Sequence, residues 1–181
     1  MIYYISDLHL DDERVFGLCH RPFSSLKDME NELILKWNKK VKDEDEVYVL
    51  GDLSLKFNQS VCEFFNKTNG IKHLIVGNHD EDNLSEIINA KVFKNISHIK
   101  YIDDGDKRVC LCHYPIMDWQ SGDRTIHHIY GHIHNKNKEN GGDMYGKMKD
   151  FYKNLPAYNA SVDVIEFEPK TIDELIKIKE E

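Results

Sequence analysis

The chain has 181 residues, of which 40% are apolar and 31% are charged, and this composition excludes an intrinsically disordered chain. The length suits one hydrophobic core of ordinary size, so we expect residues 1–181 to form a single domain. The formal net charge of −8 argues against a broad basic surface for duplex nucleic acid.

Strands are predicted to alternate with helices in the first half of the chain. The predicted strands cover Ile2 to Ser6, Glu46 to Leu50 and Ile71 to Val76. The predicted helices cover Leu26 to Val41, about Ser60 to Lys67, and about Asn83 to Ala90. Ser25 and Asp28 form a capping-box-like start for the first helix, whereas Asp11 to Ser24 lacks a clear period and is expected to be a surface loop. This alternation predicts right-handed crossovers and a largely parallel sheet whose strand ends meet on one edge.

The second half of the chain is richer in predicted strands. Apolar runs at Val92 to Ile102 and Val109 to Cys112 are separated by Asp104-Gly105, which is a hairpin turn signal. Two further strands are expected at about Ile126 to Tyr130 and at Ser161 to Phe167. The intervening Lys136 to Lys153 has the composition of a mobile loop, and Thr171 with Glu174 starts a final helix.

The cysteine content and the hydropathy indicate a cellular compartment. Four cysteines are present, and we expect them to be free thiols: Cys19, Cys62, Cys110 and Cys112. No stretch approaches the roughly 20 apolar residues that span a bilayer, and Met1 to Ile5 is too short for a secretory signal. The sequence therefore predicts a cytoplasmic protein without a membrane partner.

Side chains that bind metals follow directly after the predicted strands. They form five clusters: Asp7-Leu8-His9, Gly51-Asp52, Gly77-Asn78-His79-Asp80, His113, and Gly131-His132-Ile133-His134. If the backbone of the first cluster is extended, Asp7 and His9 point to the same side and can share one cation. Gly131 lets the backbone approach such a site without an intervening Cβ. Each cluster alone has an ordinary alternative, because Gly and Asn form turns and His113 can be a satisfied histidine at a strand end.

In this order the clusters D-x-H, G-D, G-N-H-D, H and G-H-x-H resemble the calcineurin-like metallophosphoesterase family, including its small bacterial and phage members, from residue 7 to residue 134. The resemblance implies an α/β fold, a four-layer α-β-β-α sandwich of two mixed sheets. It implies two divalent cations. One would be held by Asp7, His9 and His134, and the other by Asn78, His113 and His132, with Asp52 bridging them. Such hard oxygen and imidazole ligands favour Mn, with Fe, Zn or Co as alternatives.

The family resemblance also implies a function, namely a hydrolase of ester bonds that depends on a binuclear metal centre. We expect a phosphodiesterase of small phosphoesters, with nucleotide-like molecules among the candidates. A metal-bridging hydroxide would attack phosphorus, and His79, held by Asp80, would donate a proton to the leaving alkoxide. Arg21 is a candidate contact for substrate phosphate and Trp119 is a candidate for stacking on a base, the alternatives being a solvated loop residue and aromatic packing.

Two other functions stay open at this point. A non-catalytic scaffold or interaction protein of the same fold would be expected to have lost ligands or the donor histidine, and this chain retains all eight positions. The second alternative is a phosphomonoesterase or a protein phosphatase. The protein phosphatases of the superfamily usually continue Gly-Asp with Val-Asp-Arg-Gly, whereas here Asp52 is followed by Leu53-Ser54-Leu55. A small-molecule substrate is therefore favoured.

Overall fold

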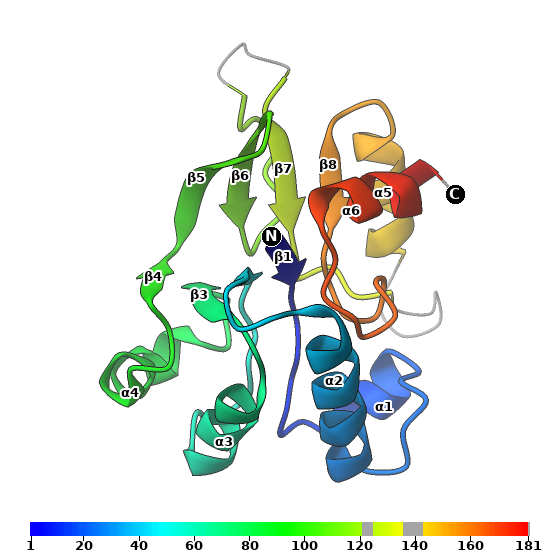
Figure 1. Ribbon diagram of the computed structural model, residues 1–181. Helices are drawn as coiled ribbons and strands as arrows, with labels where there is room; N and C mark the ends of the chain where they lie inside the picture. The colour runs from blue at the N-terminus through cyan, green and yellow to red at the C-terminus, as the bar shows by residue number, and fades with distance from the viewer. Residues whose placement is uncertain (121–124, 136–142, 181) are drawn as a thin grey trace.

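A computed structural model describes residues 1–120, 125–135 and 143–180 and contains two four-stranded sheets with helices around them (Figure 1). The elements of the first half are β1 Ile2–Ile5, α1 Arg14–Leu18, α2 Leu26–Lys40, β2 Glu46–Val49, α3 Gln59–Lys67, β3 Ile71–Ile75, η1 Glu81–Asn83, α4 Leu84–Ala90 and β4 Asn95–Ser97. Those of the second half are β5 Ile99–Asp104, β6 Lys107–Cys112, β7 His127–Tyr130, α5 Met144–Tyr152, β8 Ala157–Asn159 and α6 Ile172–Glu180.

The strand order explains which residues meet at one edge. The first sheet has the order β1-β2-β3-β4, and all its pairings are parallel. The second sheet has the order β5-β6-β7-β8, in which β5 and β6 form the predicted antiparallel hairpin and the other pairs are parallel. The predicted fold class, an α/β arrangement of two sheets, is confirmed, although only the second sheet mixes directions among its strands.

The first sheet lies between a helical layer and the second sheet, as the alternating side chains of β1 show. The Tyr3 hydroxyl donates to the Lys40 carbonyl of α2 at 3.4 Å, whereas the Tyr4 hydroxyl donates to Asp104 Oδ2 of β5 at 2.9 Å. Neighbouring residues of a strand point to opposite faces. One face of the first sheet is therefore covered by α2, and the other face packs on the second sheet.

The second sheet likewise separates two groups of buried side chains. Val109 and Leu111 of β6 belong to the main core, while Cys110 between them belongs to a smaller cluster with Trp119 and Tyr152. Tyr152 is the last residue of α5, so this helix lies on the outer face of the sheet. The layers are thus helix, sheet, sheet and helix.

The starts of two helices agree with their predicted caps. Ser25 Oγ accepts a hydrogen bond from the Asp28 N–H at 3.1 Å, and α2 begins at the next residue, Leu26. The Thr171 N–H donates to Glu174 Oε2 at 2.8 Å, and α6 follows directly. Each cap satisfies N–H groups that a helix end leaves free. Because these bonds join residues three apart, the local sequence was sufficient to predict where both helices begin.

Two predicted loops contain helices. The segment Asp11 to Ser24 includes the short helix α1, whose Val15 is buried. Of the predicted loop Lys136 to Lys153, residues 136–142 lie outside the described residues and Met144–Tyr152 form α5. Asp143 caps α5, since its side chain accepts from the Gly146 N–H at 2.9 Å. The glycine and lysine content of this segment favoured a loop, so the prediction missed the N-cap and the apolar face of α5.

The predicted last strand, Ser161 to Phe167, is wrong, because this segment folds into consecutive turns. The Val164 and Ile165 N–H groups both donate to the Ser161 carbonyl, at 2.8 and 3.1 Å. The last strand is instead β8, Ala157–Asn159, which pairs with β7. Apolar residues in a tight turn can mimic the alternation of a strand.

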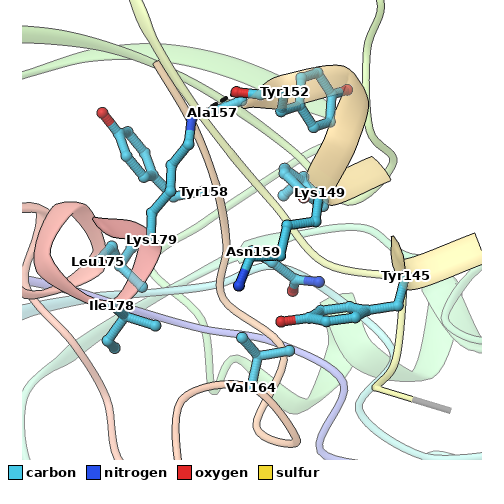
Figure 2. Close-up of a pocket in the computed structure, with 11 residues that line it drawn as sticks. Tyr145, Lys149, Tyr152, Ala157, Tyr158, Asn159, Val164, Leu175, Ile178 and Lys179 are labelled. Carbon is cyan, nitrogen blue, oxygen red and sulfur yellow. Dashed lines mark hydrogen bonds between the residues drawn. The ribbon is translucent and has the colours of Figure 1, made fainter. Parts of the chain in front are cut away.

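A small cavity of about 60 Å³ lies between α5, β8 and α6 (Figure 2). The Lys179 ammonium of α6 donates to the Tyr152 carbonyl at 2.7 Å and also to the Leu155 carbonyl. These bonds tie α6 to the end of α5. The cavity is lined by none of the metal-binding candidates, and its size fits packing of two helices on a strand.

Two further expectations concern cysteines and membranes. All four cysteines are free thiols, as predicted. Within the described ranges, none of the helices combines the length and apolar character that crossing a membrane requires.

We expect the stability of the metal-free protein to depend on pH through His128. This side chain is fully buried, its Nδ1 lies 3.1 Å from the Cys110 carbonyl, and its Nε2 accepts from the Ile116 N–H at 3.2 Å. Burial lowers the pKa of His128 to about 4, below the value of about 6.5 expected in the unfolded chain. The unfolded chain is therefore protonated first. The free energy of unfolding should fall by about 3 kcal/mol as the pH drops from about 6.5 to about 4.

Urea denaturation of wild type and His128→Gln across this pH window measures the effect. Glutamine can still accept from Ile116 and donate to Cys110 but does not titrate. The wild type should lose more stability than the variant on acidification, and parallel curves for the two proteins would contradict the prediction.

Candidate metal centre

The first three ligand clusters lie where the parallel strands β1, β2 and β3 end. Asp7 follows β1, Asp52 follows β2, and Asn78 follows β3. Carboxyl ends of parallel strands open onto a common crevice. The Asp7 N–H donates to the Gly51 carbonyl at 3.0 Å, and the His9 N–H donates to the Asp52 carbonyl at 3.1 Å. These backbone hydrogen bonds hold the first two clusters next to each other.

The backbone of the ligand loops is left-handed at several residues with side chains. The φ angles are 60° at Asp7, 49° at His9, 55° at Asp52 and 66° at His132. The Asp7-Leu8-His9 segment is therefore not extended, which was the condition for Asp7 and His9 to point to the same side, and Leu8 between them is fully buried. Such angles are rare outside glycine and cost of order 1–3 kcal/mol each. Strain of this kind concentrates at functional sites, where surrounding structure imposes it.

Glycines allow the loops to approach one another. A Cβ on Gly131 would lie 1.9 Å from Ser6 Oγ and 2.7 Å from Asp7 Oδ2. A Cβ on Gly77 would lie 2.5 Å from Asp52 Oδ1. No side chain fits at either position, so the predicted role of Gly131 in close approach agrees with the geometry.

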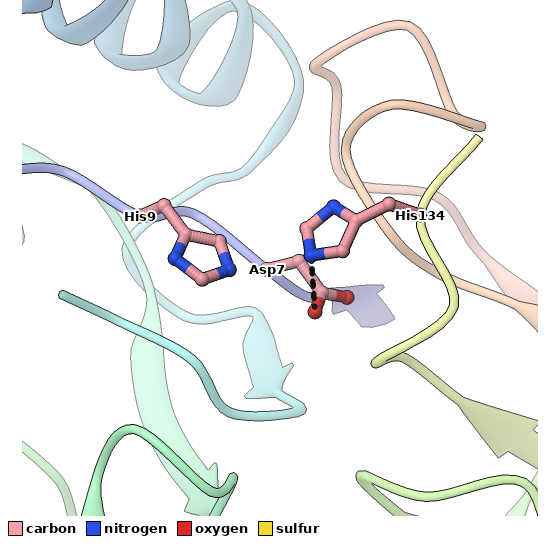
Figure 3. Close-up of side chains that lie close together, drawn as sticks. All are labelled: Asp7, His9 and His134. Carbon is pink, nitrogen blue, oxygen red and sulfur yellow. Dashed lines mark ion pairs between the residues drawn. The ribbon is translucent and has the colours of Figure 1, made fainter. Parts of the chain in front are cut away.

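One group of potential ligands consists of Asp7, His9 and His134 (Figure 3). One ligand atom from each lies within 4.8 Å of the others, and His134 Nε2 is 3.6 Å from Asp7 Oδ1. The Asp7 carboxylate also accepts the His132 N–H, at 3.1 and 3.0 Å for its two oxygens. Asp7 thus fixes the Gly-His-x-His loop while it faces His134.

A second group consists of Asp52, His113 and His132, whose ligand atoms again lie within 4.8 Å of one another. Asn78 Oδ1 is 3.1 Å from His113 Nε2, which brings Asn78 to the same place. His113 Nδ1 donates to the Leu50 carbonyl at 2.6 Å, because a carbonyl can only accept. This bond leaves Nε2 directed at Asp52, the arrangement that orients imidazoles toward metals.

Asp52 lies between the two groups. Its Oδ2 is 3.7 Å from His9 Nε2 of the first group and 3.4 Å from His113 Nε2 of the second group. Its Oδ1 accepts the His79 N–H at 3.0 Å. The structure therefore gathers all seven sequence-predicted ligands into two adjoining groups that share one carboxylate.

The chemistry of the first group suits a cation. His9 is 4% exposed, yet neither of its ring nitrogens has a hydrogen-bond partner among the described residues. Buried polar atoms are normally paired, so each such orphan requires an explanation. Burial lowers the pKa of His9 to about 4, which keeps the imidazole neutral. A neutral imidazole with a free nitrogen is the form that binds metals.

The imidazoles of His113 and His134 show the negative potential around them. Burial alone would lower the pKa of His113, but its hydrogen bond to Asp52 and the charges of Asp7 and Asp52 raise it to about 9. Burial is likewise outweighed at His134, where the hydrogen bond to Asp163 contributes to a pKa of about 10. Buried carboxylates here attract positive charge, which a divalent cation supplies more strongly than a proton.

His79 is half-buried beside the first group. Its ring is edge-on to the His9 ring with the centroids 5.2 Å apart. Its N–H donates to Asp52, and its carbonyl accepts from Asn83 Nδ2 at 3.0 Å. The backbone of His79 is thus fixed at both ends, and its ring lies next to the ligands without belonging to either ligand group.

Asp80 has a different contact from the one expected. Its buried carboxylate accepts the N–H groups of Gly77, Asp52 and Leu53 at 2.8, 2.9 and 3.0 Å. Burial raises the pKa of Asp80 to about 6, although these bonds favour the charged form. Asp80 therefore joins the loops after β2 and β3, and these contacts hold the backbone of Asp52 instead of the ring of His79.

Arg21 is also placed differently from the sequence prediction of a phosphate contact. Its side chain is fully buried and forms a salt bridge with Asp163 at 2.7 Å. Its two terminal nitrogens donate to the carbonyls of Asp7 and Leu8, each at 2.7 Å. Asp163 Oδ2 in turn lies 2.5 Å from His134 Nδ1. Arg21 and Asp163 thus connect the first ligand loop with the last ligand and leave no guanidinium edge for substrate.

Asp163 is the residue that sequence reasoning missed. It follows β8 at the same edge as the ligands, so the rule that found Asp7 and Asp52 could have found it as well. The strand was misplaced over Ser161 to Phe167, which put Asp163 in the middle of a strand. Trp119 is corrected too, because it is 3% exposed and its Nε1 donates to the Ile126 carbonyl at 2.8 Å. This burial supports the aromatic-packing alternative over stacking on a base.

We expect Asp163→Asn to weaken metal binding about 10- to 100-fold, the usual cost of losing a carboxylate that orients a ligand histidine. It should also lower the free energy of unfolding by about 3 kcal/mol, since Arg21 would keep a buried charge with a neutral partner. Chelator competition and urea denaturation measure the two effects. The control is Asp103→Asn, which removes an exposed pair with Arg108. Equal metal affinity in wild type and Asp163→Asn would contradict the prediction.

Comparison with known proteins agrees with this geometry. A model of the calcineurin-like phosphoesterase family matches residues 1–174. The chain belongs to this family. An uncharacterized protein of Methanocaldococcus jannaschii, MJ1445, is 33% identical over 182 residues, which cover 99% of this chain and 91% of that protein. The family is metal-dependent, and the His and Asp groups of this chain are placed for metal binding.

Two solved structures are similar to this chain to different degrees. The crystal structure of AQ665, a protein of unknown function from Aquifex aeolicus, has a TM-score of 0.71 and 28% identity and covers 98% of each chain. A novel archaeal phosphodiesterase has a TM-score of 0.47 and 19% identity over 74% of this chain and 73% of that chain.

Proposed function

We propose that this protein is a phosphoester hydrolase that uses two divalent cations and acts on small phosphodiesters. The observation that carries the proposal is the position of Asp52 Oδ2, which is 3.7 Å from an imidazole of one ligand group and 3.4 Å from an imidazole of the other. A carboxylate shared in this way suits two cations held side by side. Asp7, His9 and His134 would hold one cation, and Asn78, His113 and His132 the other.

The residues of the chain then have separate tasks. Two bound cations supply Lewis acidity toward the phosphoryl oxygens and an attacking water of lowered pKa. The left-handed ligand loops and the Asp80 hydrogen bonds hold the ligands before substrate arrives, so little reorganisation is needed. His79 would donate a proton to the leaving oxygen, since its ring adjoins the ligands without belonging to either group.

A diester is favoured over a monoester by charge. Arg21 is engaged with Asp163 and with backbone carbonyls, so it is not free to neutralise the second negative charge of a monoester. The substrate we propose is a small phosphodiester, with nucleotide-like molecules among the candidates, and Mn²⁺ is the first metal to test.

The test is hydrolysis of bis(p-nitrophenyl) phosphate by protein stripped with EDTA and reloaded with Mn²⁺, Fe²⁺, Zn²⁺ or Co²⁺. We expect negligible activity in the stripped protein, restored activity with Mn²⁺, and two metal ions per chain by elemental analysis. p-Nitrophenyl phosphate, a monoester, should be a poorer substrate. If every reloaded form were inert, the protein would be a scaffold with the family fold and the proposal would fail.

A further inference from the structure

An apolar cleft opens beside the second ligand group. It has a volume of about 470 Å³, within the range of about 300–1,000 Å³ for small-molecule sites. Its lining consists of Tyr114, Pro115, Met117, His132, Ile133, Met144, Met148, Phe151 and Tyr152. His132 is also a proposed metal ligand, so the cleft and the metal centre share a wall.

The cleft gathers large apolar side chains that remain exposed to solvent. Met117 is 78% exposed, Met144 is 50% exposed, and Tyr114 and Phe151 are 45% and 41% exposed. Single exposed apolar residues are common, but several around one concave site indicate a binding surface. The three methionine side chains are flexible and polarizable, which suits apolar groups of varied shape.

Tyr114 connects the cleft with the ligands. Its ring is edge-on to the ring of His113 at a centroid distance of 5.1 Å and to that of His132 at 4.9 Å. A group in the cleft would therefore lie against the imidazoles that would hold the second cation. This proximity suits a substituent joined to the phosphate at the metal centre.

The charge of the lining restricts the chemical class of the occupant. Among the described residues, the lining contains no lysine, arginine, aspartate or glutamate. The Tyr152 hydroxyl already donates to the Ile116 carbonyl at 2.9 Å. The described part of the lining thus offers few groups for reading the edge of a nucleobase and no cationic side chain to pair with a further phosphate.

We propose that this cleft binds an uncharged apolar ester group of the substrate, alkyl or aryl, while the phosphodiester lies at the metal centre. The inference rests on the proposed function and narrows its substrate class. Transfer of each methylene group of the ester from water into the cleft contributes enough free energy to raise kcat/KM by up to about fourfold.

The kinetic test uses p-nitrophenyl phosphodiesters whose second ester group is methyl, butyl, octyl, phenyl or thymidin-5′-yl, with Mn-loaded protein. We expect kcat/KM to increase along the alkyl series. The comparison of the octyl ester with the phenyl ester shows whether the cleft prefers an alkyl or an aryl group. Met117→Ser and Phe151→Ser should reduce the ratio of octyl to methyl activity. Leu35→Ser, which replaces an apolar residue of α2 that is 64% exposed, is the matched control and should leave this ratio unchanged.

A second readout does not depend on turnover. The chain has five methionines, of which Met117, Met144 and Met148 line the cleft and Met1 and Met29 do not. In protein loaded with diamagnetic Zn²⁺, octylphosphonate should shift the methyl-¹³C signals of the three cleft methionines and leave that of buried Met29 in place. Methylphosphonate should not produce these shifts.

The results of these experiments distinguish the inference about the cleft from the proposed function. Hydrolysis of the methyl ester without dependence on the ester group, or a thymidine ester preferred over octyl and phenyl, would overturn the inference and leave the proposed function standing. Absence of hydrolysis for every ester would overturn the proposed function. Octylphosphonate that shifts no cleft methionine would overturn the inference whatever the activity.

Discussion

Asp52→Asn is expected to lower kcat for bis(p-nitrophenyl) phosphate by more than about 10³-fold, because loss of a single oxyanion-stabilising donor already costs about 10² to 10³. The Asp52 carboxylate is shared by the two ligand groups, so its replacement should affect both proposed cations at once. Asparagine keeps an oxygen that can accept the His79 N–H, a bond of 3.0 Å in the wild type. The loop should therefore keep its backbone while it loses the negative charge.

Metal content distinguishes this effect from misfolding. Elemental analysis of Asp52→Asn should give fewer than two ions per chain, while urea denaturation of the metal-free variant should show a cooperative transition. Asp82→Asn, which replaces an exposed aspartate of η1, serves as the control and should retain activity and metal. A variant with two ions and wild-type kcat would remove Asp52 from the bridging role.

His79→Gln is expected to lower kcat about 10²- to 10⁴-fold for diesters with an alkoxide leaving group, with little change in metal content. The ring of His79 lies beside that of His9, and the seven proposed ligands do not include it. The loss should depend on the leaving group. It should be small for p-nitrophenolate, which leaves readily as an anion, and large for an alkoxide, which needs a proton.

The leaving-group series is the measurement that separates proton donation from a merely structural role. Kinetics of Mn-loaded wild type and His79→Gln should be compared for diesters with p-nitrophenyl and alkyl leaving groups. His98→Gln replaces an exposed histidine that pairs with Glu81 at 2.9 Å, and it should match the wild type. An equal loss of kcat for every leaving group would exclude His79 as the proton donor.

Local sequence patterns predicted most of the elements because they depend on neighbours in the chain. The cap formed by Ser25 and Asp28 and the Asp104-Gly105 turn each lie within a few residues, and both are found in the structure. The same holds for the ligand clusters. A strand end followed by Asp or Asn in an alternating α/β chain places the side chain at the functional edge, whatever the later packing.

Contacts between distant segments could not be predicted in this way. Arg21 and Asp163 are 142 positions apart, and a misplaced last strand hid the acid that holds His134. The family resemblance implied that Asp80 holds His79, but Asp80 accepts N–H groups of Asp52 and Leu53 from another loop.

The amino-acid sequence by itself determined the kinds of ligands, their order and their placement after strands, because side-chain chemistry and strand periodicity are local properties. Only the tertiary structure decided the left-handed backbone at Asp7 and His9, the burial of Arg21, and the apolar cleft beside His132. These features arise where loops from different strands pack together, and the packing sets both the backbone angles and the solvent exposure of each side chain.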